Sequence, residues 1–284
     1  TCCVAGCGEI KINEEEKYFL DKNGNKYSEG DWISLDGSTG NVYGTRLPTV
    51  EPSMTGYFAT IMQWADEYRK LKIRTNADTP KDAAQALKFG AEGIGLCRTE
   101  HMFFEPDRIS AMREMIVSRT EDQRRAALDK LLPMQRSDFE ALFTEMKGYP
   151  VTIRFLDPPL HEFLPQDEED IIKLADEMRI KPSELKQIVK DLHEFNPMLG
   201  HRGCRLSVTY PEIAEMQTKA VIEAAINVTK KGITVTPEIM IPLIGEIKEL
   251  KYVKDIVVNT ADEIIKNSGI DMKYKVGTMI EIPR

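Results

Sequence analysis

The chain has 284 residues, of which 42% are hydrophobic and 30% are charged, and its formal net charge is −8. This balance is typical of a soluble globular protein, and its acidic sign argues against nucleic acid and an anionic membrane surface as partners. No apolar run reaches the roughly 20 residues that a membrane-spanning helix needs. The five cysteines are an odd number scattered along the chain. They favour a reducing compartment, so we expect a cytoplasmic protein.

Residues 1–47 predict a small β-rich region. Short runs such as EIKIN (9–13) and KYFL (17–20) are separated by Asn-Gly and Asp-Gly dipeptides, which are strong signals for β-hairpins. The chain opens within an apolar, small-residue stretch and closes on a strand-like run. We therefore expect an internal piece of a longer protein, beginning with the tail of a small β-containing domain.

Residues 48–71 predict a linker followed by a hinge helix. Pro, Ser, Thr and Gly dominate the sequence between residues 45 and 56, as is usual in a connection between two folded bodies. The residues that follow carry apolar side chains at helical spacing, namely Phe58, Ile61, Met62, Ala65 and Tyr68.

Residues 72–284 predict an α/β domain in which strand-like runs alternate with amphipathic helices. Helical spacing is clearest in residues 80–91, 121–148 and 211–232. The expected strands lie in residues 71–78, 93–100, 151–157, 202–208, 237–245 and 274–283. This alternation implies a parallel sheet. Its regularity indicates a TIM-type (β/α)8 barrel that is incomplete, because about six of the eight strand units are present. A doubly wound sheet would give much the same pattern.

Arginines recur where the expected strands end, and that edge of a parallel α/β sheet usually carries the functional residues. The three arginines that stand out are Arg98, Arg154 and Arg202. A planar guanidinium group suits carboxylate and phosphate, so this edge predicts a site for a small ligand that bears both groups. Glu281, at the end of the last run, would be well placed to hold a hard divalent metal ion that bridges the same ligand.

Ordinary ion pairing is the alternative explanation for these arginines, because buried guanidinium groups are costly unless they are paired. Arg98 could pair with Glu100, and Arg154 could pair with Asp157. For the whole set this explanation is weaker, since the arginines outnumber the nearby acids. Glu100 is then expected to orient Arg98, and Phe103 is expected, with its neighbour Phe104, to wall the site or pack beneath it.

The cysteines predict packing roles. Cys2, Cys3 and Cys7 lack the paired spacing of a zinc site, and no histidine lies near them. Cys97 and Cys204 fall within strand-like runs and are expected in the core.

Five strings together closely resemble the pyruvate, phosphate dikinases, which are phosphoenolpyruvate-utilising enzymes. They lie in residues 77–104, 152–165, 196–206, 237–243 and 277–284. The resemblance covers nearly the whole chain. The strings CRTEHMFF (97–104) and DPPLHEF (157–163) look like the dikinase and unlike its relatives phosphoenolpyruvate synthase and the phosphotransferase-system enzyme I.

The resemblance implies an enzyme that interconverts ATP, phosphate and pyruvate with AMP, pyrophosphate and phosphoenolpyruvate. It implies a phosphohistidine on a mobile domain, whose C-terminal part would be residues 1–47. That domain would swing between a nucleotide-binding domain of the same full-length chain and a barrel that binds phosphoenolpyruvate and pyruvate, here residues 72–284. A homodimer is the corresponding expectation for the full-length protein.

The resemblance also implies roles for single residues. Arg98, Arg154 and Arg202 match arginines that bind the phosphoryl group and the oxygens of the substrate, and Glu281 matches a ligand of Mg2+. The phosphohistidine, a second metal ligand and a cysteine that acts as acid and base are expected outside this chain. The fragment alone is therefore expected to be inactive.

Two other classes of function remain open from the sequence. A metal-dependent barrel lyase or aldolase handles similar enolates, but it would need neither the β-rich region nor the hinge, and its metal ligands should all lie within the barrel. A non-catalytic binding or dimerisation module would use the arginines to recognise acidic groups of a partner.

Overall fold

The computed structural model describes residues 2–50, 55–105, 107–193 and 196–283. These residues form two compact units that divide between Glu67 and Tyr68. Part of the predicted linker, residues 51–54, lies outside the described residues.

The N-terminal unit contains two small antiparallel sheets. One consists of β1 (Lys11–Asn13), β2 (Tyr18–Leu20) and β3 (Lys26–Ser28), and the other of β4 (Ser34–Asp36) and β5 (Asn41–Tyr43). The turns between β2 and β3 and between β4 and β5 contain the predicted dipeptides, whereas residues 14–17, between β1 and β2, contain neither. In the turn between β2 and β3, the carboxylate of Asp21 accepts hydrogen bonds from the backbone N–H groups of Asn23 and Asn25, at 2.8 and 2.9 Å. The short strands predicted for this region are therefore confirmed.

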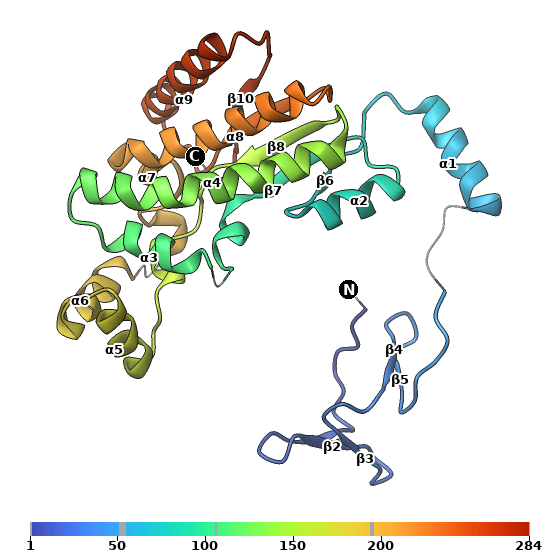
Figure 1. Ribbon diagram of the computed structural model, residues 1–284. Helices are drawn as coiled ribbons and strands as arrows, with labels where there is room; N and C mark the ends of the chain where they lie inside the picture. The colour runs from blue at the N-terminus through green and yellow to red at the C-terminus, as the bar shows by residue number, and fades with distance from the viewer. Residues whose placement is uncertain (1, 51–54, 106, 194–195, 284) are drawn as a thin grey trace. The chain divides into compact units, whose positions relative to one another are not determined.

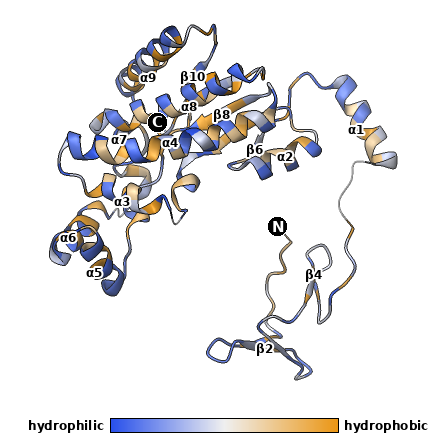
Figure 2. Cartoon of the chain, in the orientation of Figure 1, coloured by the Kyte–Doolittle hydropathy of each residue, from blue (hydrophilic) through white to orange (hydrophobic). Residues whose placement is uncertain are grey.

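Side-chain packing is sparse in this unit. None of its described residues is buried. Helix α1 (Gly56–Tyr68) coincides with the predicted hinge helix, and its aromatic side chains are exposed, Tyr57 by 92% and Trp64 by 58%. Hydrophobic and hydrophilic residues both occur along α1 in Figure 2. Turn geometry, more than a hydrophobic core, therefore gives this unit its local order.

The C-terminal unit is built on one parallel sheet (Figure 1). Its strands are β6 (Thr75–Asn76), β7 (Ile94–Arg98), β8 (Pro150–Arg154), β9 (Thr236–Ile241) and β10 (Lys275–Thr278). They lie side by side in chain order, and every neighbouring pair is parallel. In the described residues the order never reverses, whereas a doubly wound sheet reverses its order at a switch point. β6 and β10 are the edges of this sheet.

The prediction of a strand in residues 202–208 is wrong, so the described sheet has five strands and not six. The segment forms helix α7 (Gly203–Thr209), whose buried residues are Gly203, Cys204, Leu206 and Ser207. That spacing is helical, with two adjacent buried positions followed by two more one turn later. A short apolar run of this kind does not distinguish a helix from a strand by periodicity alone.

Four helices form a layer against the sheet and pack on one another in the order of the strands. They are α2 (Pro80–Lys88), α4 (Glu121–Met146), α8 (Pro211–Lys230) and α9 (Ile247–Ser268). Local signals set their ends. Thr79 and Thr120 accept hydrogen bonds from backbone N–H groups as N-caps of α2 and α4, and Gly269 ends α9 with a φ of 70°. These capping residues agree with the helices predicted from the sequence.

The main core lies between the sheet and this helical layer. On β8 and β9 the side chains of Val151, Ile153, Ile239 and Ile241 are buried in it, and β8 is drawn largely in the hydrophobic colour in Figure 2. The alternate positions along both strands carry a different set of residues, because successive side chains of a strand point to opposite faces. One face of the sheet is thus apolar and covered by helices, while the other face carries charged and polar groups.

Further short elements follow the carboxyl ends of the strands. They are the 3-10 turns Thr99–Phe103, Leu160–Phe163 and Pro197–Leu199, and the helices α3 (Ile109–Val117), α5 (Glu168–Glu177) and α6 (Pro182–Leu192). Two smaller apolar clusters hold these segments together. None of the helices in the described residues combines the length and the hydropathy that a bilayer-spanning segment requires.

Candidate functional site

The carboxyl end of the sheet brings the predicted arginines close together. Arg98 is the last residue of β7, and it pairs in register with Arg154, the last residue of β8. Arg154 is in turn aligned with Met240 of β9. Arg98 and Arg154 therefore lie side by side at the carboxyl ends of two neighbouring strands.

Arg154 is held by two carboxylates and is almost completely buried. Its guanidinium group donates to Oε1 of Glu100 and forms an ion pair of 3.0 Å with Oδ2 of Asp157. The pair of Arg154 and Asp157 is the one that the alternative explanation, ordinary ion pairing, named from the sequence. The expectation that Glu100 orients Arg98 is wrong, because Glu100 contacts Arg154. A 3-10 turn begins at Thr99 and carries Glu100 away from the neighbouring arginine towards β8.

Arg202 joins the same group through Asp157. Its Nη2 lies 2.6 Å from Oδ2 of Asp157, and its Nε donates to the backbone carbonyl of Asp157 at 3.0 Å. The two arginines thus share one carboxylate oxygen. We call Glu100, Arg154, Asp157 and Arg202 the Arg154 cluster.

The residue after Arg202 must be a glycine for this cluster to form. Gly203 has a φ of 57°, in the left-handed region. A Cβ at this position would lie 2.8 Å from Cβ of Leu243 and 3.1 Å from Oδ1 of Asp157. The backbone therefore passes close to the cluster only because it has no side chain here.

Arg98 has different partners and is more accessible. Its Nε lies 3.5 Å from Oδ2 of Asp78, and its backbone N–H donates to Oδ1 of the same residue at 2.7 Å. The imidazole of His101 also contacts Asp78, at 2.7 Å. The side chain of Arg98 is 36% exposed. Asp78 anchors the backbone at the strand end and leaves much of the Arg98 side chain open to solvent.

Glu281 lies three residues beyond the end of β10. Its carboxylate accepts a hydrogen bond of 2.8 Å from the backbone N–H of Leu243, the residue whose side chain faces Gly203. Two residues before Glu281, the sulfur atom of Met279 lies 3.7 Å from Nη1 of Arg154. Arg154 and Arg202 are thus linked through Asp157, and the segment that carries Glu281 contacts Arg154 through Met279. Arg98 lies beside Arg154 in strand register but pairs with Asp78.

A complete metal site is not present within the described residues, because no group of three or more His, Cys, Asp or Glu side chains there could hold a metal ion. Glu281 could supply one hard oxygen ligand of the kind that Mg2+ accepts. Mg2+ is commonly held by one or two carboxylates together with water and substrate oxygens. The residues therefore fit one part of a magnesium site.

Several buried polar atoms around the arginines have no hydrogen-bond partner in the described residues. They are Nε of Arg98, Oε2 of Glu100, Nε of Arg154 and Oδ1 of Asp157. Buried polar atoms are nearly always paired in folded proteins. The partners of these atoms could come from a ligand, from water or from other segments of the protein, and buried atoms of the same kind occur at Arg108 and Gln135.

A second charged group lies on the same face of the sheet, nearer the amino ends of the strands. Glu238 of β9 accepts hydrogen bonds from Arg74, from Thr152 at 2.8 Å and from Lys275 at 3.1 Å. Desolvation opposes ionisation, but these donors prevail and lower the pKa of Glu238 to about 2. We call Arg74, Thr152, Glu238 and Lys275 the Glu238 cluster.

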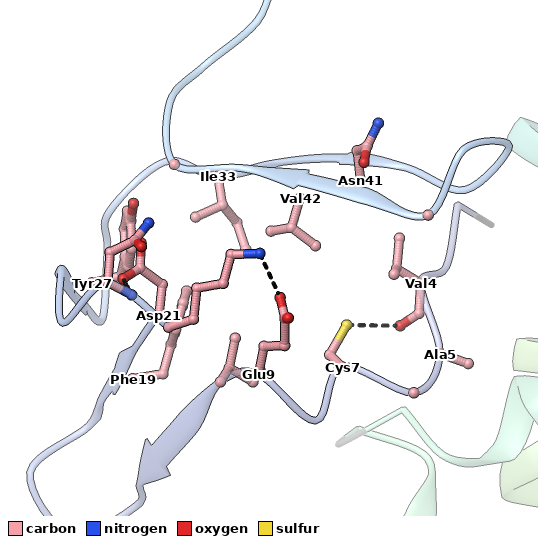
Figure 3. Close-up of a pocket in the computed structure, with 16 residues that line it drawn as sticks. Val4, Ala5, Cys7, Glu9, Phe19, Asp21, Tyr27, Ile33, Asn41 and Val42 are labelled. Carbon is pink, nitrogen blue, oxygen red and sulfur yellow. Dashed lines mark hydrogen bonds and ion pairs between the residues drawn. The ribbon is translucent and has the colours of Figure 1, made fainter.

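The N-terminal unit has a pocket of its own, of about 410 Å3, which Figure 3 shows. Val4, Phe19, Ile33 and Val42 are among the side chains that line it. An ion pair of 3.1 Å between Lys22 and Glu9 lies at the pocket. All the described residues that line this pocket belong to the N-terminal unit.

The two cysteines of the C-terminal unit are buried, as predicted. Desolvation raises the pKa of Cys97 well above its ordinary value and that of Cys204 to about 12. Phe103 is also buried, and Phe104 stacks on Phe163 with 4.7 Å between the ring centroids. Phe103 therefore packs in an apolar cluster after β7, whereas Phe104 stays 46% exposed.

The sequence reasoning missed Gln217 of α8. This residue is 1% exposed and contacts the segments that follow both β7 and β8. A signal was available, because Gln217 lies four residues from both Ile213 and Val221, on an otherwise apolar side of the helix.

Comparison with known proteins gives a consistent result. The model of the family described as "PEP-utilising enzyme, PEP-binding domain" matches residues 53–284. The chain is 60% identical over 285 residues to the pyruvate, phosphate dikinase of Clostridium symbiosum, with 100% of the chain and 32% of that relative covered. It is 54% identical over 285 residues to the pyruvate, phosphate dikinase of Rhizobium meliloti (strain 1021), with the same coverage.

The chloroplastic pyruvate, phosphate dikinase of Mesembryanthemum crystallinum is 52% identical over 287 residues, with 100% of the chain and 30% of that relative covered. The chain thus spans about a third of the length of the curated relatives that it matches. The family match covers all five strands of the parallel sheet, together with Arg98, Arg154, Arg202 and Glu281. The chain therefore belongs to the PEP-utilising enzymes, in the family defined by their PEP-binding domain.

Proposed function

We propose that this chain is the part of a pyruvate, phosphate dikinase that binds phosphoenolpyruvate and pyruvate. The full-length enzyme would interconvert ATP, phosphate and pyruvate with AMP, pyrophosphate and phosphoenolpyruvate through a phosphohistidine. The observation that carries this proposal is the Arg154 cluster, in which two arginines share Asp157 at the carboxyl end of a parallel sheet. The names of the relatives favour the dikinase over phosphoenolpyruvate synthase and enzyme I.

The arginines have the chemistry that this substrate requires. Phosphoenolpyruvate carries a phosphoryl group and a carboxylate, and guanidinium groups bind both with paired, charge-assisted hydrogen bonds. Phosphoryl transfer depends mainly on positioning and on stabilisation of the developing charge. Arg98, the most accessible of the three, would contact the transferring phosphoryl group. Arg154 and Arg202 would bind substrate oxygens while Asp157 holds them in place.

Glu281 would hold Mg2+ together with ligands from outside the described residues. When bound, the ion would neutralise charge on the substrate oxygens that it bridges. The hydrogen bond from the backbone of Leu243 supports this role, because it orients the carboxylate. A metal-dependent lyase with a complete set of protein ligands in this chain is not proposed, since the described residues contain no such set.

We propose the following organisation for the full-length protein. Residues 1–47 would end the phosphohistidine domain, residues 48–71 would form the hinge, and residues 72–284 would form most of a (β/α)8 barrel. Two observations support the barrel. The strand order runs without reversal in the described sheet, and the four long helices form a single layer against one face of it, whereas a doubly wound sheet carries helices on both faces. The full-length protein would also contain a nucleotide-binding domain. It would form a homodimer and would be located in the cytoplasm.

The experiment that tests this function is the variant Arg154→Ala in the full-length protein, with Arg125→Ala as the control. Arg125 also forms two carboxylate pairs, but it lies on the outer helix α4. We expect Arg154→Ala to lower transfer between the phosphohistidine and pyruvate by about 10²–10³-fold or more and Arg125→Ala to leave it unchanged. Omission of Mg2+ should abolish the reaction in the wild type. If Arg154→Ala phosphorylated pyruvate at the wild-type rate, the assignment of the site would be wrong.

A further inference from the structure

Gln217 connects the two loops from which the Arg154 cluster is built. Its side-chain amide donates from Nε2 to Oγ1 of Thr99 at 3.1 Å and accepts at Oε1 from the backbone N–H of Leu156 at 2.8 Å. All three residues are buried. Thr99 follows directly after β7, and Leu156 lies two residues beyond β8. A single side chain from α8 therefore contacts the segments after two neighbouring strands.

The backbone N–H of Leu156 needs an acceptor, and Gln217 supplies it. The hydrogen bonds between the strand residues of β8 and β9 continue to Phe155, whose N–H donates to the carbonyl of Met240 at 3.1 Å. The next residue, Leu156, is buried beyond the end of the strand, and its N–H must still find an acceptor. An N–H group can only donate, so the atom of Gln217 that faces it is the carbonyl oxygen. The amide NH2 group is then directed to the hydroxyl of Thr99.

The neighbours of these two contact points are the carboxylates that hold Arg154. Glu100 directly follows Thr99, and Asp157 directly follows Leu156. Both carboxylates contact the guanidinium group of Arg154, and each leaves one buried oxygen without a partner in the described residues. The separation between the two loops therefore sets where the guanidinium group of Arg154 lies.

We propose that Gln217 is a positioning residue, which fixes the loops after β7 and β8 so that Glu100 and Asp157 hold Arg154 in its working orientation. This proposal rests on the function proposed above. Gln217 itself would touch neither the substrate nor the reacting atoms. A displacement of about 1 Å in such a site costs on the order of 10²-fold in rate, so a buried amide outside the site would influence catalysis strongly.

The test is the variant Gln217→Met in the full-length protein, with Gln135→Met as the matched control. Methionine has nearly the volume of glutamine but can replace neither hydrogen bond. Gln135 of α4 is also fully buried, and in the described residues neither polar atom of its side chain has a hydrogen-bond partner. The two substitutions therefore make the same chemical change at two buried sites, and only one of them breaks the link between the loops.

We expect Gln217→Met to lower the rate of phosphoryl transfer from the phosphohistidine to pyruvate by about 10- to 100-fold. Phosphorylation of the histidine by ATP should stay at the wild-type rate, because it would occur at a different domain. A purely structural role would not separate the two half-reactions in this way. Gln135→Met should leave both of them unchanged.

Thr99→Val provides a second, milder variant, since it removes a hydroxyl group and little volume. If Gln217→Met does not fold, Thr99→Val alone should still lower pyruvate phosphorylation selectively. If both fold, the double variant should lose less than the product of the two single effects, because both remove the same hydrogen bond.

Equal rates of pyruvate phosphorylation in wild type, Gln217→Met and Thr99→Val would overturn the proposal. An equal loss in both half-reactions would do the same. Arg154→Ala separates this failure from failure of the proposed function. If Arg154→Ala is inactive with pyruvate while Gln217→Met is fully active, only the role of Gln217 is wrong. If Arg154→Ala is fully active, the site assignment itself is wrong.

Discussion

The Arg154 cluster and the Glu238 cluster lie on the same face of one sheet, yet they differ in how far their polar groups are paired. Glu238 receives hydrogen bonds from three side chains, and its pKa, despite desolvation, is lowered to about 2. In the Arg154 cluster, Glu100 and Asp157 each keep one buried oxygen without a partner in the described residues. The polar groups of the Glu238 cluster are paired with one another, whereas the Arg154 cluster keeps two carboxylate oxygens and Nε of Arg154 without a partner in the described residues.

The two clusters begin only two positions apart on one strand. Thr152 and Arg154 lie on the same side of β8, one in each cluster. In parallel barrels the amino-terminal side of the strands usually contributes stability, and the carboxyl-terminal side carries the active site. The pairing of the polar groups agrees with that division. Three variants test it, and the one with the largest expected effect comes first.

Asp157→Asn should have the largest effect. The carboxylate of Asp157 is 3% exposed and pairs with both Arg154 and Arg202, so its neutralisation leaves two buried guanidinium groups without their shared partner. We expect pyruvate phosphorylation in the full-length protein to fall by about 10²–10³-fold and the local free energy of unfolding to fall by about 3–5 kcal/mol. Steady-state kinetics and hydrogen exchange of β8 peptides would measure the two effects.

Glu238→Gln is the matched change in the other cluster. It should reduce protection of β8 and β9 against hydrogen exchange and leave the rate of pyruvate phosphorylation close to that of the wild type. A loss of activity as large as that of Asp157→Asn would contradict the division between the two clusters.

Gly203→Ala should have an intermediate effect. The new Cβ would meet Leu243 at 2.8 Å and Asp157 at 3.1 Å, at a φ of 57°. Overpacking and left-handed backbone strain together should destabilise the domain by about 2–4 kcal/mol and displace Arg202. Gly232→Ala is the control, because Gly232 also has a positive φ but has no atom within 4 Å of the modified position. It should cost only about 1 kcal/mol. The free energy of unfolding of both variants would be measured by urea denaturation. If Gly203→Ala and Gly232→Ala lost the same amount, the contacts of the new Cβ with Leu243 and Asp157 would not contribute.

The smallest effect is a dependence of stability on pH that comes from Glu238. The pKa of this residue is about 2 in the folded protein, below its ordinary value of 4.5. As the pH falls from about 4.5 to 2, the unfolded chain takes up this proton before the folded one does. The stabilisation is therefore complete above about pH 4.5 and is lost progressively below it.

The measurement is the midpoint of unfolding in urea at pH 5 and at pH 3, in the wild type and in Glu238→Gln. Hydrogen exchange of the β9 peptides would follow the unfolding. The wild type should lose more stability between the two pH values than the variant, because the variant lacks the titrating group. Identical losses would mean that the hydrogen bonds to Glu238 do not favour its ionised form.

The sequence was sufficient to predict much of the architecture. Turn dipeptides predicted the β2–β3 and β4–β5 hairpins of the N-terminal unit, and periodicity predicted α2, α4 and α8, because both signals are local and act over a few residues. The strands at β7, β8 and β9 were also predicted, since each is a short apolar run with turn signals around it. The segment 202–208 was not, because a buried helix of two turns and a strand look alike in a short apolar run.

The partner of Arg98 was decided only by the tertiary structure, whereas the pair of Arg154 and Asp157 was already visible in the sequence. Arg98 and Glu100 are two residues apart, and proximity in the chain suggested that they pair. The parallel register places Arg98 beside Arg154, and the turn that begins at Thr99 brings Glu100 to Arg154. Asp78, from the preceding strand end, takes the place beside Arg98.

By itself, the sequence determined that Arg98 and Arg154 end two strands and that these ends lie on the same side of a parallel sheet. Only the tertiary structure decided which carboxylate pairs with Arg98, how deeply the two arginines are buried and that Gln217 links the loops that follow them. Local sequence controls secondary structure through backbone preferences and periodic burial. Ion pairs and buried hydrogen bonds depend on strand register and on a helix that lies more than a hundred residues further along the chain than Thr99, and no local pattern specifies either.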